Sequence, residues 1–121
     1  MEQQIFDEFV NAINKHDADK LYELMSEDHQ FIDAHGNLVA GKNKMKAGWI
    51  GYFQLFPDYK IEIKEVFTKD QVVAALGFAE GTFKRNHWRL PAAWKAVIEN
   101  EKVMIWQVYA DTKIPFDSMK S

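Results

Sequence analysis

The stretch that decides the fold runs from YKIEIK at residues 59–64 through VVAALGFAEGTF at 72–83 to KVMIWQVYAD at 102–111. In YKIEIK every second residue is apolar, which is the period of a half-buried strand. The middle segment is long and apolar, and Gly77 and Gly81 inside it suggest bends or bulges that curve a sheet. The sequence therefore predicts a curved sheet in the second half of the chain.

Turn residues divide this half into four long antiparallel strands. The polar segment at 68–71 separates the first two strands, a polar loop tip at 84–86 follows the second, and Asn100-Glu101 closes the last hairpin. Pro91 marks a kink or a sheet edge within the third strand. The expected strand segments after the loop tip are 87–90, 92–99 and 102–111.

The first half of the chain has the spacing of helices instead. Ile5, Phe9 and Ile13 lie four residues apart, which predicts a first helix with one apolar face. Asp17 is a suitable N-cap for a second, short helix that ends at 26–28. A short strand at 30–33 follows this helix.

A turn at 35–37 leads into a third helix from about Lys42 to Phe56, which Pro57 ends. Gly48 and Gly51 reduce the stability of this helix, and close packing at those positions would make them easier to tolerate. Helices followed by a strand meander indicate the α+β class. We expect one domain over residues 1–121, a cone of three N-terminal helices under a strongly curved, mostly antiparallel sheet, with a polar, loosely held tail from 112.

Composition excludes several classes of protein. The net charge of -3 provides no basic surface for nucleic acid or an anionic membrane. Without cysteine, disulfides and thiolate chemistry are excluded. The polar N-terminus does not resemble a secretory signal, and no apolar run approaches the roughly 20 residues of a membrane helix. We expect a cytoplasmic protein that binds neither nucleic acid nor membrane.

Three stretches resemble one known group of proteins: FVNAINKHD at 9–17, FIDAHG at 31–36, and KVMIWQVYAD at 102–111. Together with the order of elements, they resemble the SnoaL-like branch of the NTF2-like superfamily, over nearly the whole chain. That superfamily includes ketosteroid isomerase and limonene epoxide hydrolase. The resemblance implies a cystatin-like cone with a small-molecule pocket and a homodimer formed through the sheet. Because many functions share this fold, it implies no particular reaction.

The resemblance makes Asp33 the first candidate for catalysis. It corresponds to the general base of ketosteroid isomerase, and burial beside apolar rings would raise its pKa. The alternative is that Asp33 accepts backbone N–H groups of the turn that follows it. His35 is a candidate partner. The tyrosine and aspartate of the isomerase's oxyanion hole correspond to Phe9 and a position near Ala93, so that hole is absent here.

Asp111 is the second candidate. By resemblance to SnoaL-like cyclases, a carboxylate at the end of the last strand acts as acid and base in an aldol closure. The histidine that accompanies it there corresponds to Phe83, and His87 lies four residues further on. The alternative is a cap on the end of the strand.

Aromatic residues make up 14% of the chain, so rings either fill a core or line a cavity. The candidate ligand-binding residues are Trp49, Tyr52, Phe56, His87, Trp94, Trp106 and Tyr109. In the last strand, alternation places Met104, Trp106 and Val108 on one face and Ile105 and Tyr109 on the other. One face would line the pocket and the other would meet a partner subunit, and a bulge would exchange them.

The chain has no paired histidines or glycine-rich loop, so we expect no metal and no cofactor. Three functions remain open. The first is an isomerase or aldol cyclase that moves a proton on a small carbonyl compound. The second is a non-catalytic module that binds a small apolar or aromatic molecule. The third is an interaction domain with a core filled by rings.

Overall fold

The computed structural model describes residues 1–111, with three helices and six strands in that range. The elements in chain order are α1 (Glu2–Asn14), α2 (Ala18–Leu24), β1 (Met25–Ile32), β2 (Leu38–Ala40), α3 (Lys42–Leu55), β3 (Lys60–Lys69), β4 (Val72–Phe83), β5 (Asn86–Glu99) and β6 (Lys102–Ala110). The predicted tail from residue 112 lies outside the described residues.

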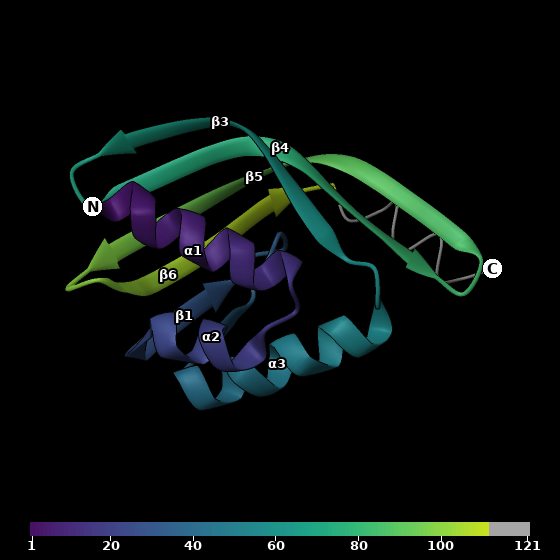
Figure 1. Cartoon of the computed structure of the whole chain (residues 1–121), viewed down its shortest axis with the longest axis horizontal. Helices are drawn as coiled ribbons and strands as arrows, with labels where there is room; N and C mark the ends of the chain where they lie inside the picture. Colours follow the sequence, from purple (N-terminus) through teal and green to yellow (C-terminus); the bar gives the residue numbers. More distant parts are fainter. Residues whose placement is uncertain (112–121) are drawn as a thin grey trace.

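The strands form one sheet in the order β2-β1-β6-β5-β4-β3. The β1–β6 pair is parallel, and every other pair is antiparallel. In Figure 1 the long strands β3 to β6 arch over α1, while α2 and α3 lie below. The predicted α+β cone, with three helices against a strongly curved and mostly antiparallel sheet, is therefore confirmed.

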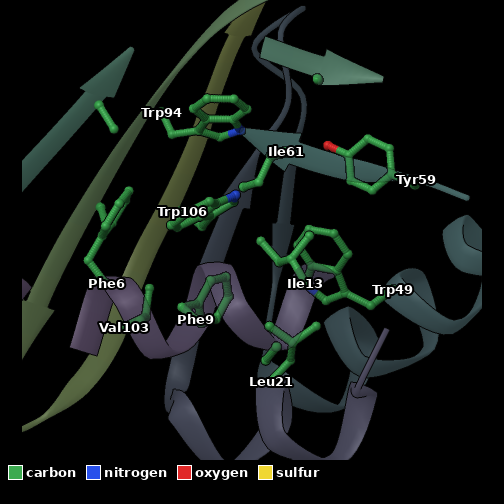
Figure 2. Packing of buried hydrophobic residues seen from close by; sticks show 14 of the residues in the cluster. Phe6, Phe9, Ile13, Leu21, Trp49, Tyr59, Ile61, Trp94, Val103 and Trp106 are labelled. Atoms are coloured by element: carbon green, nitrogen blue, oxygen red, sulfur yellow. The ribbon is translucent and has the colours of Figure 1, made fainter. Parts of the chain in front are cut away.

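The core lies between α1 and the concave face of the sheet. Phe6, Phe9 and Ile13 of α1 are fully buried and face the tryptophans of the sheet in Figure 2. The ring of Phe9 packs 4.7 Å from that of Trp106, and the ring of Phe6 lies 5.5 Å from it. This packing accounts for the apolar spacing of the first helix.

Polar contacts hold the end of α1 against the edge strand β3. The Asn14 side chain accepts the N–H of Ile61 at 2.8 Å and donates to the carbonyl of the same residue at 3.0 Å. His16 donates to the carbonyl of Tyr59 at 2.6 Å, and its ring stacks on Phe53 at 4.1 Å. These contacts fix the start of β3 between α1 and α3.

Gly77 allows the sheet to bend sharply. The register of β3 against β4 shifts between Ile63 and Glu65, opposite Gly77. A Cβ atom at position 77 would overlap the backbone carbonyl oxygen of Glu62. An irregularity is present opposite Gly77 as predicted, but the extra residue belongs to β3, and the pairing of β4 with β5 is regular through Gly81. Because of this bend, the first half of β3 descends toward α3 while the second half crosses α1 (Figure 1).

Three elements differ from the sequence prediction. β1 already starts at Met25, which pairs with Val103 of β6. Residues 26–28 therefore belong to this strand and do not end α2, although they are polar. The three-residue edge strand β2 was missed. β5 is continuous through Pro91, since its pairing with β6 starts only at Ala92 and Pro91 needs no amide hydrogen on that side.

A bulge also decides which residues of β6 face inward. Pairing with β5 jumps from Ile105 to Val103, so Met104 is an extra residue. Val103 and Trp106 are consequently both buried, although they are three residues apart. Trp106 and Val108 share the inner face as expected, while simple alternation fails at Met104.

No helix among residues 1–111 is both long and apolar enough to cross a bilayer.

Replacement of Gly77 by alanine tests the bend. We expect Gly77→Ala to destabilise the fold by about 2–3 kcal/mol, because the added methyl group meets backbone that cannot rotate away. Gly51→Ala is the matched control. A Cβ at position 51 meets nothing within 4 Å, so the close packing considered for this glycine is absent and alanine should stabilise α3 by roughly 0.5–1 kcal/mol. Urea unfolding of both variants measures the difference, and equal effects would contradict this role of Gly77.

Candidate functional site

A cavity of about 470 Å³ opens between α3, the β1–β2 turn and the inner face of β6. A volume of this order suits a small organic ligand. The described residues that line it are Phe31, Asp33, Ala34, His35, Val39, Met45, Gly48, Trp49, Tyr52, Leu55, Phe56, Tyr59, Trp106 and Val108. Most of them are apolar or aromatic, so the wall favours an apolar ligand.

One face of α3 forms much of the wall. Met45, Gly48, Trp49, Tyr52 and Leu55 recur at intervals of three and four residues, which places them in one row along the helix. A Cβ added to Gly48 would meet only the flexible end of Met45, at 3.6 Å. Position 48 can therefore accept a side chain that would occupy part of the cavity.

The rings of the wall support one another by edge-to-face contacts. Trp49 meets Phe31 with ring centroids 6.1 Å apart, and Tyr52 meets Phe56 at 5.0 Å. Such pairs are favoured by the charge distribution of aromatic rings and hold the side chains in place. The indole N–H of Trp49 is buried and forms no hydrogen bond with the described residues.

Two tyrosines of the cavity wall lie against each other. The rings of Tyr52 and Tyr59 are perpendicular, with centroids 4.7 Å apart. Burial raises the pKa of Tyr52 to about 12. Burial and the neighbouring Tyr52 raise the pKa of Tyr59 well above its usual value. Both hydroxyls are therefore protonated at neutral pH.

Asp33 lies at the cavity mouth within a tight turn. Its Oδ1 accepts the N–H groups of His35 at 2.8 Å and of Asn37 at 2.9 Å, and its Oδ2 accepts the Asn37 side chain at 3.2 Å. Gly36 completes the turn with φ of +84°. The alternative given for Asp33, an acceptor of backbone N–H groups, is thus present in the structure.

The pKa of Asp33 is lowered, whereas the sequence argument expected it to be raised. Burial alone would raise this pKa, but the hydrogen bonds from Asn37 and His35 together outweigh burial and stabilise the carboxylate. Asp33 is ionised at neutral pH.

The structure brings six of the ten predicted site residues to this cavity. They are Asp33, His35, Trp49, Tyr52, Phe56 and Trp106. The other four lie elsewhere. Trp94 is buried in the core, Tyr109 is half exposed on the outer face of the sheet, and Asp111 is exposed beyond the end of β6.

His87 lies at the distant tip of β4 and β5. Its Nδ1 is 2.9 Å from the Thr82 hydroxyl, and its ring nitrogens are within 4 Å of Asp58 and Glu80. Arg89 forms ion pairs with Glu80 and with Glu62 of β3. Among the described residues no arginine lines the cavity, so the Asp–Arg–Asp set of the limonene hydrolase is not assembled there.

The oxyanion donors of ketosteroid isomerase have no counterpart at the positions named from the sequence. Phe9 is fully buried against Trp106 and Trp49. Ala93 pairs with Leu76 and Tyr109, both exposed on the outer face of the sheet. Any donor to a ligand must come from other residues.

Tyr59 is the main aromatic residue of the cavity wall that the sequence did not predict there. It was placed at the start of a strand, and its cavity position follows from the same alternation that buries Ile61. The sequence analysis also did not place Phe31, Val39 and Val108 at the cavity, because their apolar side chains carry no functional group that would mark them as site residues.

Within residues 1–111, no three histidine, aspartate or glutamate side chains are grouped so that they could hold a metal ion.

Solved structures share this fold at low sequence identity. A protein named as a SnoaL-like polyketide cyclase, from Jannaschia sp. CCS1, has a TM-score of 0.89 and 13% identity, with 99% of this chain and 92% of that chain covered. An NTF2-like protein from Burkholderia pseudomallei K96243 has a TM-score of 0.87 and 13% identity, with 99% and 98% covered.

A third solved structure is that of a hypothetical protein from Catenulispora acidiphila DSM 44928, with a ketosteroid isomerase-like fold and in complex with trimethylamine. Its TM-score is 0.86 at 15% identity, with 94% of this chain and 90% of that chain covered. Identities this low establish the NTF2-like fold and not an activity. No curated protein matches the sequence.

A family model covers almost the whole described chain. The model of the SnoaL-like domain matches residues 6–114. This agrees with the curved sheet, the three helices and the cavity at the mouth of the cone. The chain belongs to the SnoaL-like domain family.

Proposed function

We propose that this protein binds a small, mostly apolar carbonyl compound in the cavity of the cone. The observation that carries this proposal is the combination of an aromatic wall with two protonated phenols and one ionised carboxylate. The rings favour an apolar body, and the phenols favour an oxygen that accepts hydrogen bonds. A cavity of about 470 Å³ also argues against an interaction domain with a filled core.

Proton transfer by Asp33 is the chemistry that the same site supports. Asp33 is the carboxylate that lines the cavity among the described residues, and it is ionised at neutral pH. An ionised carboxylate accepts a proton from the carbon next to a carbonyl group. The hydrogen bonds of its turn hold it at one position, while its lowered pKa makes it a weaker base. Binding without catalysis is the alternative that the experiments below distinguish.

The Gly48→Leu variant tests whether the ligand occupies this cavity. 2-Acetylnaphthalene, an aromatic ketone, is a suitable probe. A leucine side chain at position 48 should weaken its binding at least about tenfold by occupying part of the cavity, a cost of about 1.4 kcal/mol. Leucine favours the helix over glycine by roughly 0.8 kcal/mol, so the fold itself should not suffer.

Gly51→Leu is the matched control, because Gly51 lies on α3 but does not line the cavity. Ligand-dependent shifts in melting temperature report binding to the native state. Affinity that is the same in wild type and both variants would place the binding site elsewhere.

The Asp33→Asn variant separates catalysis from the structure of the turn. Asparagine keeps an oxygen for the N–H groups of His35 and Asn37 but cannot accept the proton. We expect the variant to bind the ketone, and to exchange the hydrogens of its methyl group in D₂O about 100-fold more slowly, as measured by NMR. An unchanged exchange rate would exclude Asp33 as the base.

The lowered pKa of Asp33 also predicts a pH dependence. The carboxylate form is favoured in the folded state, so its stabilising effect is complete above the unfolded pKa of about 3.9 and is lost as pH falls through the lower folded pKa. The exchange rate follows the fraction of folded protein in which Asp33 is a carboxylate. It should stay level from pH 7 down to about 4 and fall below that.

We also propose that a second copy of the chain covers the outer face of the sheet. Phe67, Leu76 and Tyr109 are 58%, 45% and 50% exposed. Leu76 pairs with Ala93, and Ala93 with Tyr109, which places Leu76 and Tyr109 in one row across three strands; Phe67 lies opposite Ala74, two residues from Leu76 on β4. An apolar row of this kind is typical of an interface between proteins.

Leu76→Arg should convert a dimer into a monomer, because the arginine would be buried without a partner. Leu38→Arg is the control, since Leu38 is similarly exposed but lies on the edge strand β2. Sedimentation at micromolar concentration measures the mass, and a monomeric wild type would exclude this dimer.

A further inference from the structure

Tyr52 and Tyr59 form a pair of donors with no established role. They come from different elements, α3 and the segment before β3, and meet edge to face at the cavity wall. We propose that these two hydroxyls recognise one oxygen atom of the ligand and so select carbonyl compounds over hydrocarbons of the same shape. This inference rests on the proposed ligand pocket and names the residues that decide its specificity.

The first support is that both hydroxyls are available to a ligand. No hydrogen bond to another described residue contributes to the pKa of either phenol. Tyr59 is only 8% exposed, and a buried tyrosine hydroxyl normally has a hydrogen-bond partner. In Figure 2 the hydroxyl oxygen of Tyr59 points to the side on which Trp94 and Trp106 lie. Trp106 is part of the cavity wall.

The second support is that Tyr59 is held firmly. Its carbonyl accepts a hydrogen bond from His16, and its N–H donates to the carbonyl of Phe56 at 2.9 Å. Its ring also contacts Trp88, at 6.2 Å between centroids. Donors fixed in advance bind an oxygen without the cost of ordering them.

The third support is the division of polar groups along the cavity. Asp33 offers oxygens that accept hydrogen bonds, and the phenols offer protons over the whole neutral range. An ester, ketone or aldehyde oxygen matches the phenols, whereas a ligand carboxylate would meet the like charge of Asp33 at the mouth. The preferred ligand class is therefore a neutral carbonyl compound.

The test compares two probes of the same shape on phenylalanine variants. 2-Acetylnaphthalene carries the carbonyl oxygen, and 2-isopropenylnaphthalene carries a CH₂ group in its place. Tyr52→Phe and Tyr59→Phe keep the rings and remove only the hydroxyls. Tyr109→Phe, on the outer face, is the matched control.

We expect each cavity variant to weaken ketone binding about fivefold to tenfold, as for the loss of one hydrogen bond, and to leave hydrocarbon binding unchanged. The infrared carbonyl band of the bound ketone should lie at lower frequency in wild type and shift toward its value in an apolar solvent in the double variant. Packing effects alone would not move this band.

Other results would overturn the proposal in distinguishable ways. Equal losses for both probes would mean that the phenols only pack, and a wild type that does not prefer the ketone would leave the pocket but remove the role of the phenols. If neither probe bound to wild type, the proposed function would fall as well. Trimethylammonium that bound more tightly than the ketone, and depended on Asp33, would make the cavity an aromatic site for a cation.

Discussion

The close approach of Gly77 to the carbonyl of Glu62 is the constraint on which the rest of the structure depends. It permits β3 to bend, so that one half of the strand crosses α1 and the other reaches α3. The descending half brings Ile61 to the side chain of Asn14. Tyr59, just before it, thereby becomes a fixed part of the cavity wall. A straight strand would leave the helices without this second attachment to the sheet.

The polar groups of the cavity differ in their protonation state at neutral pH. Burial raises the pKa values of Tyr52 and Tyr59, because it disfavours their charged form, so both phenols stay protonated well above neutral pH. The pKa of Asp33 is lowered, because its turn supplies three hydrogen bonds that outweigh burial. Two opposite effects of the local structure thus preserve donors in the wall and an acceptor at the mouth over a wide pH range, within one apolar enclosure. This difference gives a bound molecule a direction, which apolar rings alone would not provide.

The sequence predicted the parts of the fold and site that depend on local periodicity. Trp49, Tyr52 and Phe56 reach the cavity because helical spacing is regular, and Trp106 does so because it shares a strand face with Val108. Tyr109 illustrates the limit, since alternation places it on the face opposite Trp106, and only the structure shows that this face is the outer one. The role of Asp33 also needed the structure, because the hydrogen bonds that lower its pKa depend on turn geometry. His87 was a candidate because it is near Phe83 in sequence, but it pairs with Thr82 at the tip of β4 and β5, and neither it nor Phe83 lines the cavity.

The cavity wall is divided unequally between helix and sheet, and this has an evolutionary consequence. β6 contributes two residues, one of them the core residue Trp106, while α3 contributes a full row that includes the exposed positions Gly48 and Leu55. Substitutions at those two positions reshape the cavity without touching the packing between α1 and the sheet. A lineage with this architecture can therefore acquire new ligands by changing one helix, while the folding requirements on the sheet stay the same.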